Sequence, residues 1–308
     1  MNNDLTSTGI AEPGVETKTD TDVVAQEPRV SRNGFEKKRE DTEHNSQGPP
    51  KSTVREYFES LVVTFIMALF GMTFIVQAVK VPTGSMQNTI VVGDHLLVNK
   101  FIFAPGASLP LLPQREIGRG DIVVFKYPGN PHNPEGDKKP DNLPYKTNYV
   151  KRVVGLPGDT IEIRGVQVLI NGKVLPEHII EGRNLDEKAP LETNETAPRA
   201  AGDAYSIYYY PSSLKSASKG EETDASLQGN YAVNGKPFKI PADSYFVMGD
   251  NRDNSTDSRA WGVVPRELIV GRAMFVYWSY DESAHTAGNF LLDFFRNTRW
   301  ERTGTMVK

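Results

Sequence analysis

The longest apolar stretch of the chain runs from Ser60 to Val79 and reads SLVVTFIMALFGMTFIVQAV. It contains 20 residues and no charged side chain. As an α-helix it would extend about 30 Å, the thickness of the hydrocarbon core of a bilayer. The alternative is a buried core helix, but its length and the lack of a polar face argue against that. We therefore expect one transmembrane helix over residues 56–79.

Basic residues are unequally distributed around this span. Five precede it closely, whereas the nearest ones after it are Lys80 and Lys100. The five are Lys37, Lys38, Arg39, Lys51 and Arg55. Because basic flanks stay in the cytoplasm, the N-terminus is expected there, and everything from Lys80 onward outside the cell. No later segment has comparable length, so we expect a single-pass protein of the cell membrane.

Residues 1–55 are rich in charged and small polar side chains and nearly free of aromatic ones. Such a composition cannot bury enough apolar surface to offset chain entropy. We expect a disordered cytoplasmic tail that serves as a spacer or as a docking segment. No apolar region lies near Met1, so the tail is not a secretory signal peptide.

Beyond the span, apolar residues alternate with polar ones over short distances, which is typical of β-strands. The expected strands are Asp121–Tyr127, Tyr149–Val154, Tyr205–Tyr210, Tyr245–Met248 and Ala273–Tyr280. Asn171-Gly172 lies between two apolar runs, which predicts a two-residue hairpin turn. The fold class is therefore mainly β behind one helix.

Two apolar stretches leave alternatives open. The first, His95–Pro113, could be a core strand or an exposed patch for membrane or partner contact. The second, Phe290–Trp300, is too short to span a bilayer. It could lie at the membrane interface or pack on the core.

Composition and charge exclude several classes of function. The net charge of −4 gives no basic field for nucleic acid. The chain has no cysteine, so disulfides and thiol nucleophiles are absent. Its five histidines are scattered without the spacing of a metal site. The acidic segment GDNRDNSTDSR, residues 249–259, lacks the glutamate and central glycine of an EF-hand loop.

Three segments contain residues suited to catalysis: VPTGSMQNTIVVGD at 81–94, YVKRVVGLPGD at 149–159, and GDNRDNSTDSR. A serine such as Ser85 needs a base to remove its proton and donors for the resulting oxyanion. In the predicted strand, Lys151 shares a face with Tyr149 and Val153, and Arg152 lies on the other face. Burial would lower the pKa of a lysine and make it a base, but periodicity alone does not say which face is buried.

These segments, in this order behind an apolar anchor, resemble the bacterial type I signal peptidases, and the likeness covers most of Ser60 to Ser279. The resemblance implies that Ser85 is the nucleophile and that Lys151 is the general base. It also implies that the Thr83 hydroxyl and the Ser85 N–H form the oxyanion hole. No cofactor or metal is implied.

The same resemblance assigns supporting residues in the third segment. Ser255 would orient the Lys151 amine, and Asp257 and Arg259 would support the site. One departure is visible: the family usually has proline after the S-M-x triplet, whereas this chain has Asn88. The local turn is therefore expected to differ from that of the family.

The resemblance implies a membrane-bound serine endopeptidase that removes signal peptides from exported preproteins through an acyl-enzyme. It further implies an antiparallel β catalytic domain, residues 80–159 and 241–308, with an inserted β-rich cap at 160–240. The expected partners are signal peptides and membrane lipid, with the protein a monomer in the membrane. Two rivals are a Ser/Lys self-cleaving repressor-type regulator, which would need a DNA-binding module, and an inactive membrane-tethered binding module.

Overall fold

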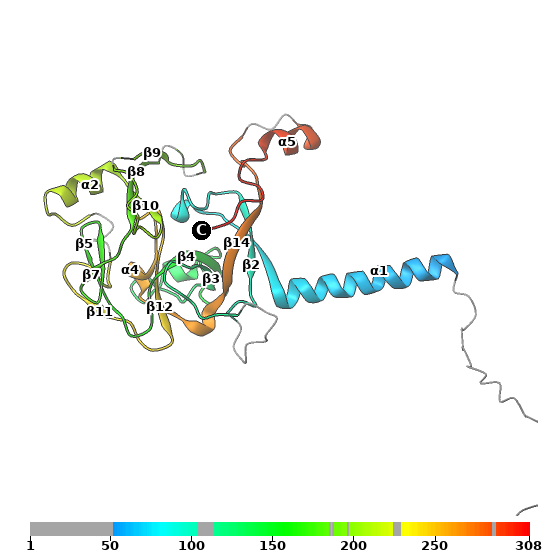
Figure 1. The fold of residues 1–308 in the computed structure, drawn as a ribbon, viewed down its shortest axis with the longest axis horizontal. Coiled ribbons are helices and arrows are strands. Elements are labelled where there is room, and N and C mark those ends of the chain that lie inside the picture. The colour runs from blue at the N-terminus through cyan, green and yellow to red at the C-terminus, as the bar shows by residue number, and fades with distance from the viewer. Residues whose placement is uncertain are drawn as a thin grey trace, which may run out of the picture. The chain divides into compact units, whose positions relative to one another are not determined.

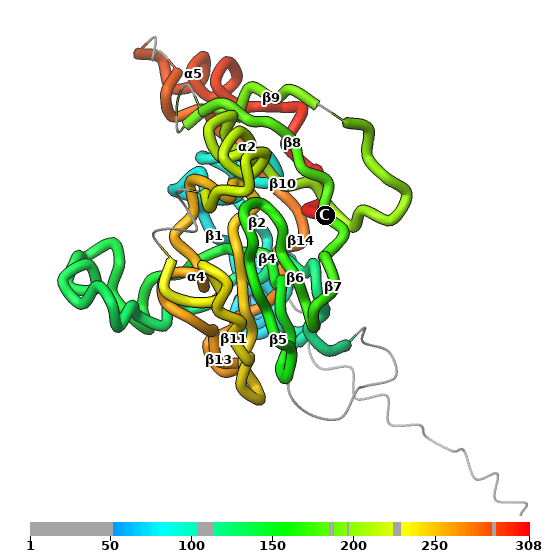
Figure 2. Tube along the Cα trace, turned by 90° about the vertical axis from the view of Figure 1, so that its left-hand side faces the viewer, coloured from blue at the N-terminus to red at the C-terminus, as the bar shows by residue number. Residues whose placement is uncertain are grey.

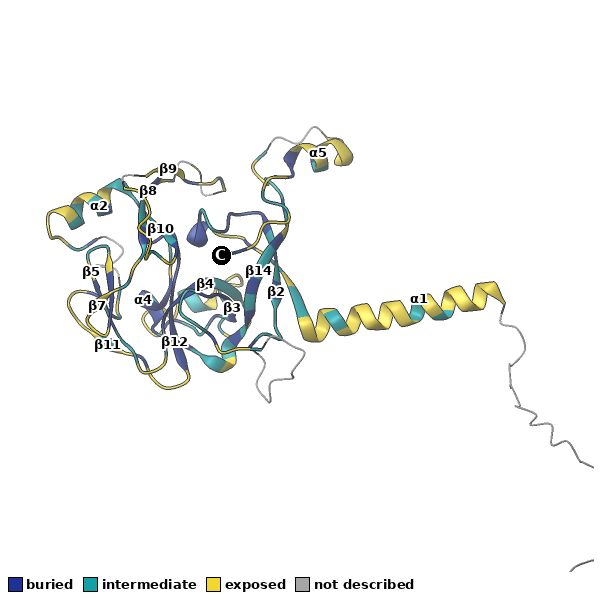
Figure 3. Ribbon diagram, viewed as in Figure 1, coloured by how far each residue is buried: buried dark blue, intermediate teal, exposed yellow. Residues whose placement is uncertain are grey.

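The structure is a computed structural model, and it describes residues 52–308 except 104–113, 185, 187, 196, 224–228 and 285–287. The predicted tail therefore lies almost entirely outside the described residues. Helix α1, Thr53–Phe70, continues through one π-helical turn, Gly71–Ile75. This 23-residue segment is long and apolar enough to cross a membrane. Its residues are exposed along almost the whole length (Figure 3), as expected for a helix whose solvent is lipid.

The predicted end of this helix is wrong. The helix begins at Thr53 rather than at residue 56 and ends at Ile75, and residues 76–79 belong to strand β1, Val76–Lys80. β1 pairs with β2, Asp94–Asn99, so that Val76 faces Asn99 and Lys80 faces His95. An apolar run with two valines suits a strand as well as a helix. Pairing with β2 selects the strand over the helix. Hydropathy of the apolar run alone does not reveal this partner, because β2 lies later in the sequence.

A seven-stranded sheet, in the order β1-β2-β14-β3-β4-β12-β13, forms the body of the molecule, and every pair in it is antiparallel (Figure 1). The remaining strands of this sheet are β3 Ile122–Lys126, β4 Asn148–Gly155, β12 Ser244–Met248, β13 Val264–Pro265 and β14 Ile269–Ser279. The strands expected at Asp121–Tyr127, Tyr149–Val154, Tyr245–Met248 and Ala273–Tyr280 are thus confirmed. β14 is the longest and starts before Ala273.

The segment between β4 and β12 forms two smaller sheets. One has the order β11-β5-β6-β7, and its strands lie side by side in Figure 2. The other has the order β10-β8-β9, with β10 parallel to β8. The bounds are β5 Thr160–Arg164, β6 Gln167–Ile170, β7 Lys173–Val174, β8 His178–Arg183, β9 Glu192–Asn194, β10 Ser206–Tyr209 and β11 Phe238–Lys239. Helix α2, Pro211–Ser218, follows β10.

The predicted hairpin is present between β6 and β7. Asn171 and Gly172 both have positive φ, 53° and 78°, as a type I′ turn requires. The strand expected at Tyr205–Tyr210 is β10. Strands and turns therefore follow the sequence pattern within the insertion as well.

The insertion shares its core with the main sheet. One cluster joins Val154, Phe246 and Met248 of the main sheet to Ile161 and Ile163 of β5. Residues from Thr53 to Lys308 accordingly form one compact unit. The insertion is thus β-rich, and it packs as a continuation of the seven-stranded sheet.

The structure describes part of each of the two apolar stretches. Residues 95–99 are in β2, with Leu96 and Val98 buried, so the core-strand alternative holds there. Leu109, Leu111 and Leu112 lie outside the described residues.

In the second stretch, helix α5, Phe290–Asn297, packs Phe294 against Trp278 of β14 with ring centroids 5.8 Å apart. Phe290, Leu291, Leu292, Phe295 and Trp300 remain exposed.

Candidate active site

Ser85 lies in a one-turn 3₁₀ helix, Gly84–Met86, which follows β1 after three residues. Ser85 is buried, and the peptide N–H groups of such a first turn have no partner inside the helix. Its carbonyl oxygen accepts a hydrogen bond from the Asn251 N–H at 3.1 Å. The loop that follows β12 therefore holds the serine from behind.

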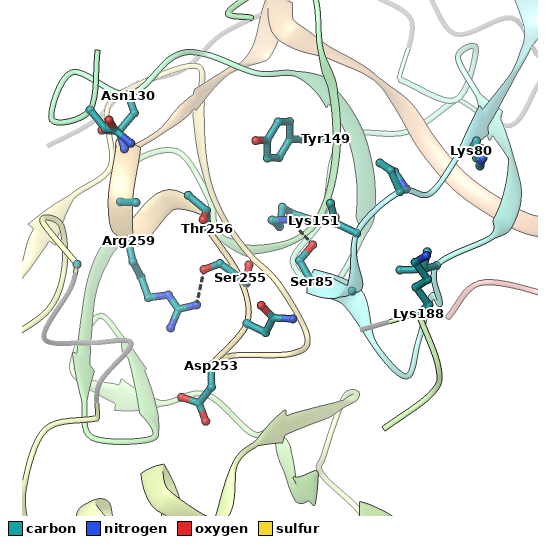
Figure 4. A pocket seen from close by; sticks show the side chains of 18 of the residues that line it. Lys80, Ser85, Asn130, Tyr149, Lys151, Lys188, Asp253, Ser255, Thr256 and Arg259 are labelled. Carbon is teal, nitrogen blue, oxygen red and sulfur yellow. Dashed lines mark hydrogen bonds between the residues drawn. The ribbon is translucent and has the colours of Figure 1, made fainter. Parts of the chain in front are cut away.

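Lys151 reaches the same point from the middle of β4. Its Nζ lies 2.5 Å from Ser85 Oγ, and the two side chains point toward each other in Figure 4. Lys151 is only 2% exposed, and the Tyr149 ring centroid lies 5.4 Å from its amine. The face of β4 that carries Lys151 and Val153 is thus buried, which the alternation alone had left open.

Burial sets the titration of this amine. Removing the ammonium ion from water lowers the pKa of Lys151 from 10.5 to about 8. The charges of Asp257 and Asp250 act in the opposite direction, and that of Arg259 adds to the lowering. A substantial fraction of Lys151 is therefore neutral near pH 8 and able to accept a proton.

Asp257 and Arg259 form a buried ion pair beside the dyad. The guanidinium donates from Nε to Oδ1 at 2.9 Å and from Nη2 to Oδ2 at 2.8 Å. Burial alone would raise the pKa of Asp257, but the Arg259 charge and hydrogen bonds hold this pKa below its usual value. Asp257 also caps the short helix α4, Ser258–Trp261, and accepts from the Gly249 N–H. The pair thus fixes the shape of the whole loop.

Ser255 lies in the cleft but has a different partner from the one expected. Its hydroxyl donates to Asp257 Oδ2 at 2.8 Å, and its carbonyl faces Arg259. Among the described residues, the hydrogen bond of the Lys151 amine goes to Ser85, and none joins it to Ser255. For the Ser255 hydroxyl, an ionised carboxylate is a stronger hydrogen-bond acceptor than a neutral amine. The predicted role of Ser255 in orienting the Lys151 amine remains a proposal.

Sequence reasoning missed two supports of the site, Gly249 and Asp250. A methyl group on Gly249 would lie 2.3 Å from Ser255 Oγ and 2.4 Å from the Ser85 carbonyl oxygen, so only glycine fits there. Asp250 pairs with Arg152 and accepts from Thr89 Oγ1 at 2.5 Å. The polar residues of the GDNRDNSTDSR segment were the signal available, but the partners of Asp250 are distant in sequence: Arg152 is 98 residues away and Thr89 is 161 residues away.

The dyad opens onto a cleft of about 1300 Å³. Thr83 lies on its wall, is exposed, and makes no capping hydrogen bond to the following helical turn. Ser255, Asn254 and Thr256 also line the cleft, together with residues of the insertion. Of the predicted site residues, Thr83, Ser85, Lys151, Ser255 and Arg259 thus line one cleft. Asp257 does not line it: this residue is fully buried and binds Ser255 and Arg259.

Several known proteins are similar to this sequence. Residues 54–278 match the profile of the family described as signal peptidase, peptidase S26. The chain belongs to this family. Signal peptidase I of Pseudomonas fluorescens is 34% identical over 243 residues, which cover 74% of this chain and 73% of that protein. Signal peptidase I of Aquifex aeolicus is 33% identical over 241 residues, covering 73% and 85%. A crystal structure of an Enterococcus faecalis signal peptidase I covers 51% of this chain and 97% of its own, with a TM-score of 0.26 and 23% identity.

For a member of the S26 family, this arrangement supplies the components of covalent acyl transfer. It has a buried serine, a buried amine within hydrogen-bond distance of the serine oxygen, and a cleft of about 1300 Å³.

Proposed function

We propose that this protein is a signal peptidase I: a membrane-anchored serine endopeptidase that removes signal peptides from exported preproteins. The observation that carries the proposal is the 2.5 Å contact between Ser85 Oγ and a buried Lys151 amine whose pKa is about 8. Family membership supports the substrate class.

In the proposed mechanism, neutral Lys151 takes the proton of Ser85 as Oγ attacks the carbonyl carbon of the scissile bond. The tetrahedral intermediate places negative charge on the former carbonyl oxygen. The Ser85 N–H and the Thr83 hydroxyl donate to this oxyanion. Ser255 contributes by holding Asp257, which together with Arg259 fixes the loop behind the dyad.

The intermediate collapses when Lys151 returns its proton to the nitrogen of the leaving peptide. The C–N bond breaks, the mature protein leaves, and the signal peptide remains as an ester on Ser85. Lys151 then takes a proton from a water molecule that attacks this ester, and returns it to Ser85 Oγ. The enzyme is restored with no cofactor.

The substrate is expected to carry small residues one and three positions before the cut, as in A-x-A. We further propose that the N-terminus is cytoplasmic and that the cleft lies outside, where an exported chain emerges. The exposed apolar residues of α5 suit contact with membrane lipid, because Phe290 and Leu291 are 80% and 64% exposed. The protein would act as a monomer in the membrane, and no nucleic acid would take part.

The deciding experiment is incubation of the purified full-length protein with a preprotein, beside the Ser85→Ala variant. We expect cleavage at the signal-peptide boundary by the wild type and none by the variant, because alanine has no nucleophilic oxygen. Self-cleavage without preprotein cleavage would favour the self-processing class. No cleavage of either by a folded wild type would favour the inactive binding module.

A further inference from the structure

Asn88 attaches the insertion to the loop that carries the nucleophile. Its Nδ2 donates to the Leu191 carbonyl at 3.1 Å, and the Leu191 N–H donates to Asn88 Oδ1 at 2.6 Å. The side-chain amide thus pairs with both backbone groups of one residue, as a neighbouring strand would. Leu191 itself is buried, and its side chain packs closely on Gly182 of β8. Proline, which the family usually has at the position of Asn88, offers neither the donor nor the acceptor.

Two further side chains hold the same stretch. Gln87 is fully buried and donates to the Ala189 carbonyl, while its Oε1 accepts from Asn251. Arg299 donates to the Lys188 carbonyl at 3.1 Å and to the Val92 carbonyl at 2.8 Å. Residues 188–191 are therefore attached to the segment that follows Ser85, directly through Gln87 and Asn88 and, through Arg299, to Val92.

The same stretch lines the catalytic cleft. Asp186 and Lys188 lie on the cleft wall with Ser85 and Lys151. Figure 4 shows Lys188 beside Ser85, on the side away from Arg259. Lys188 is exposed, and between described residues no ion pair involves its amine, whereas Lys80 nearby is paired with Glu282. Only the backbone of Lys188 takes part in the attachment, so its side chain is available to a substrate.

We propose that Asp186 and residues 188–191 form a wall of the substrate cleft, with Asn88 as the positioning residue that holds it there. In addition, the Lys188 amine favours an acidic substrate side chain close to the scissile bond. This inference rests on the proposed function, because it concerns how that same cleft binds its substrate. The sequence analysis assigned no chemistry to the insertion, and this proposal gives it a part in substrate recognition.

The first test compares Asn88→Ala with the matched control Asn194→Ala, which changes an exposed asparagine of β9. Losing two hydrogen bonds loosens the wall, so KM for a preprotein should rise about fivefold or more in Asn88→Ala. Turnover should stay within about twofold and the acidic limb of the pH profile should not move, since Lys151 and Ser85 are untouched. The control should match the wild type. An unchanged KM, or a fall in kcat with a shifted acidic limb, overturns the positioning role.

The second test needs no disruption of the attachment and decides the matter if Asn88→Ala does not fold. Paired preproteins carry Asp or Lys at one position, scanned across the residues that flank the cut. At one or more positions the wild type should prefer the Asp member by about two- to fivefold, and Lys188→Glu should reverse that preference there. If no position shows a reversal while both enzymes cleave the unmodified preprotein, the inference fails and the proposed function stands. If the wild type cleaves no preprotein, the proposed function itself fails.

Discussion

The Lys151 side chain is buried, and burial disfavours its charged ammonium form because that ion loses its hydration. An unperturbed lysine would be neutral in only about one molecule in a few thousand at pH 7. With a pKa of about 8, roughly one molecule in ten is neutral at that pH. The gain comes from burial against Tyr149 and the neighbouring strands, and the Asp257–Arg259 pair keeps the neighbouring charges nearly balanced.

The pH dependence of cleavage follows from this value. A base is active when deprotonated, so kcat/KM should rise with pH and level off above about pH 8. Lys151→Arg should be inactive, because a guanidinium does not lose its proton at working pH. The measurement is the pH profile of kcat/KM for both proteins. A rate that keeps rising to about pH 10, or an active arginine variant, would show that Lys151 is not a buried neutral base.

The same burial lowers stability at neutral pH. Because the folded state binds the proton less tightly than the unfolded state, the free energy of unfolding should increase as pH rises from about 8 to 10.5. The cost is fully present below pH 8 and corresponds to about 3 kcal/mol. Lys151→Met should therefore be inactive yet more stable at pH 7, by up to that amount.

Urea unfolding in detergent micelles at pH 7 and pH 10 tests this sign. The stability difference between Lys151→Met and the wild type should shrink at the higher pH. A variant less stable than the wild type at pH 7 would mean that the amine contributes more through its contacts than it loses through desolvation.

At the scale of elements, the alternation along β4 was sufficient to place Lys151 with Tyr149 and Val153. It was not sufficient for Arg152, which the pattern puts on the opposite face and which is nevertheless 2% exposed. That face is covered by Asp250 and by Tyr205 of the insertion, whose ring lies 4.1 Å from the guanidinium. A strand buried on both faces has no polar side to reveal it, and both covering residues are distant in sequence.

The partner of Ser255 escaped prediction for a related reason. Sequence spacing shows that Ser255, Asp257 and Arg259 lie in one loop, but not which hydroxyl rotamer the fold selects. Once Arg259 pairs with Asp257, the carboxylate is fixed two residues from Ser255 and accepts a hydrogen bond from its hydroxyl. The resemblance located the residues, and the local packing determined their hydrogen bonds.

Gly249 provides a test of how closely two elements approach. Gly249→Ala should abolish turnover and lower the melting temperature, since its methyl group would meet the Ser85 carbonyl oxygen, a backbone atom that cannot turn away. The matched control is Gly202→Ala, because a methyl group there would meet nothing within 4 Å. Thermal unfolding and preprotein turnover are measured for both. Equal behaviour of the two variants would contradict the close approach.

At the scale of the whole molecule, the absence of cysteine makes topology directly measurable. Single cysteines introduced as Thr19→Cys, in the N-terminal tail, and Ser218→Cys, at the exposed end of α2, would be the only thiols. In intact cells or spheroplasts, an impermeant maleimide should label Ser218→Cys at once and Thr19→Cys only after permeabilisation. The opposite pattern would invert the proposed orientation.

The direct passage from helix to strand at Ile75 and Val76 has a mechanical consequence. No flexible linker separates the helix from β1. The Lys100 N–H donates a hydrogen bond to the Ile75 carbonyl, and the Lys100 amine donates one to the Thr73 carbonyl. In the proposed membrane topology, this rigid connection would hold the serine at a set height above the bilayer. A substrate cut too close to its own apolar segment could then reach the serine only by drawing methylene groups out of lipid, at about 0.8 kcal/mol each. On that proposal, the anchor would set a minimum spacing between the membrane and the cut.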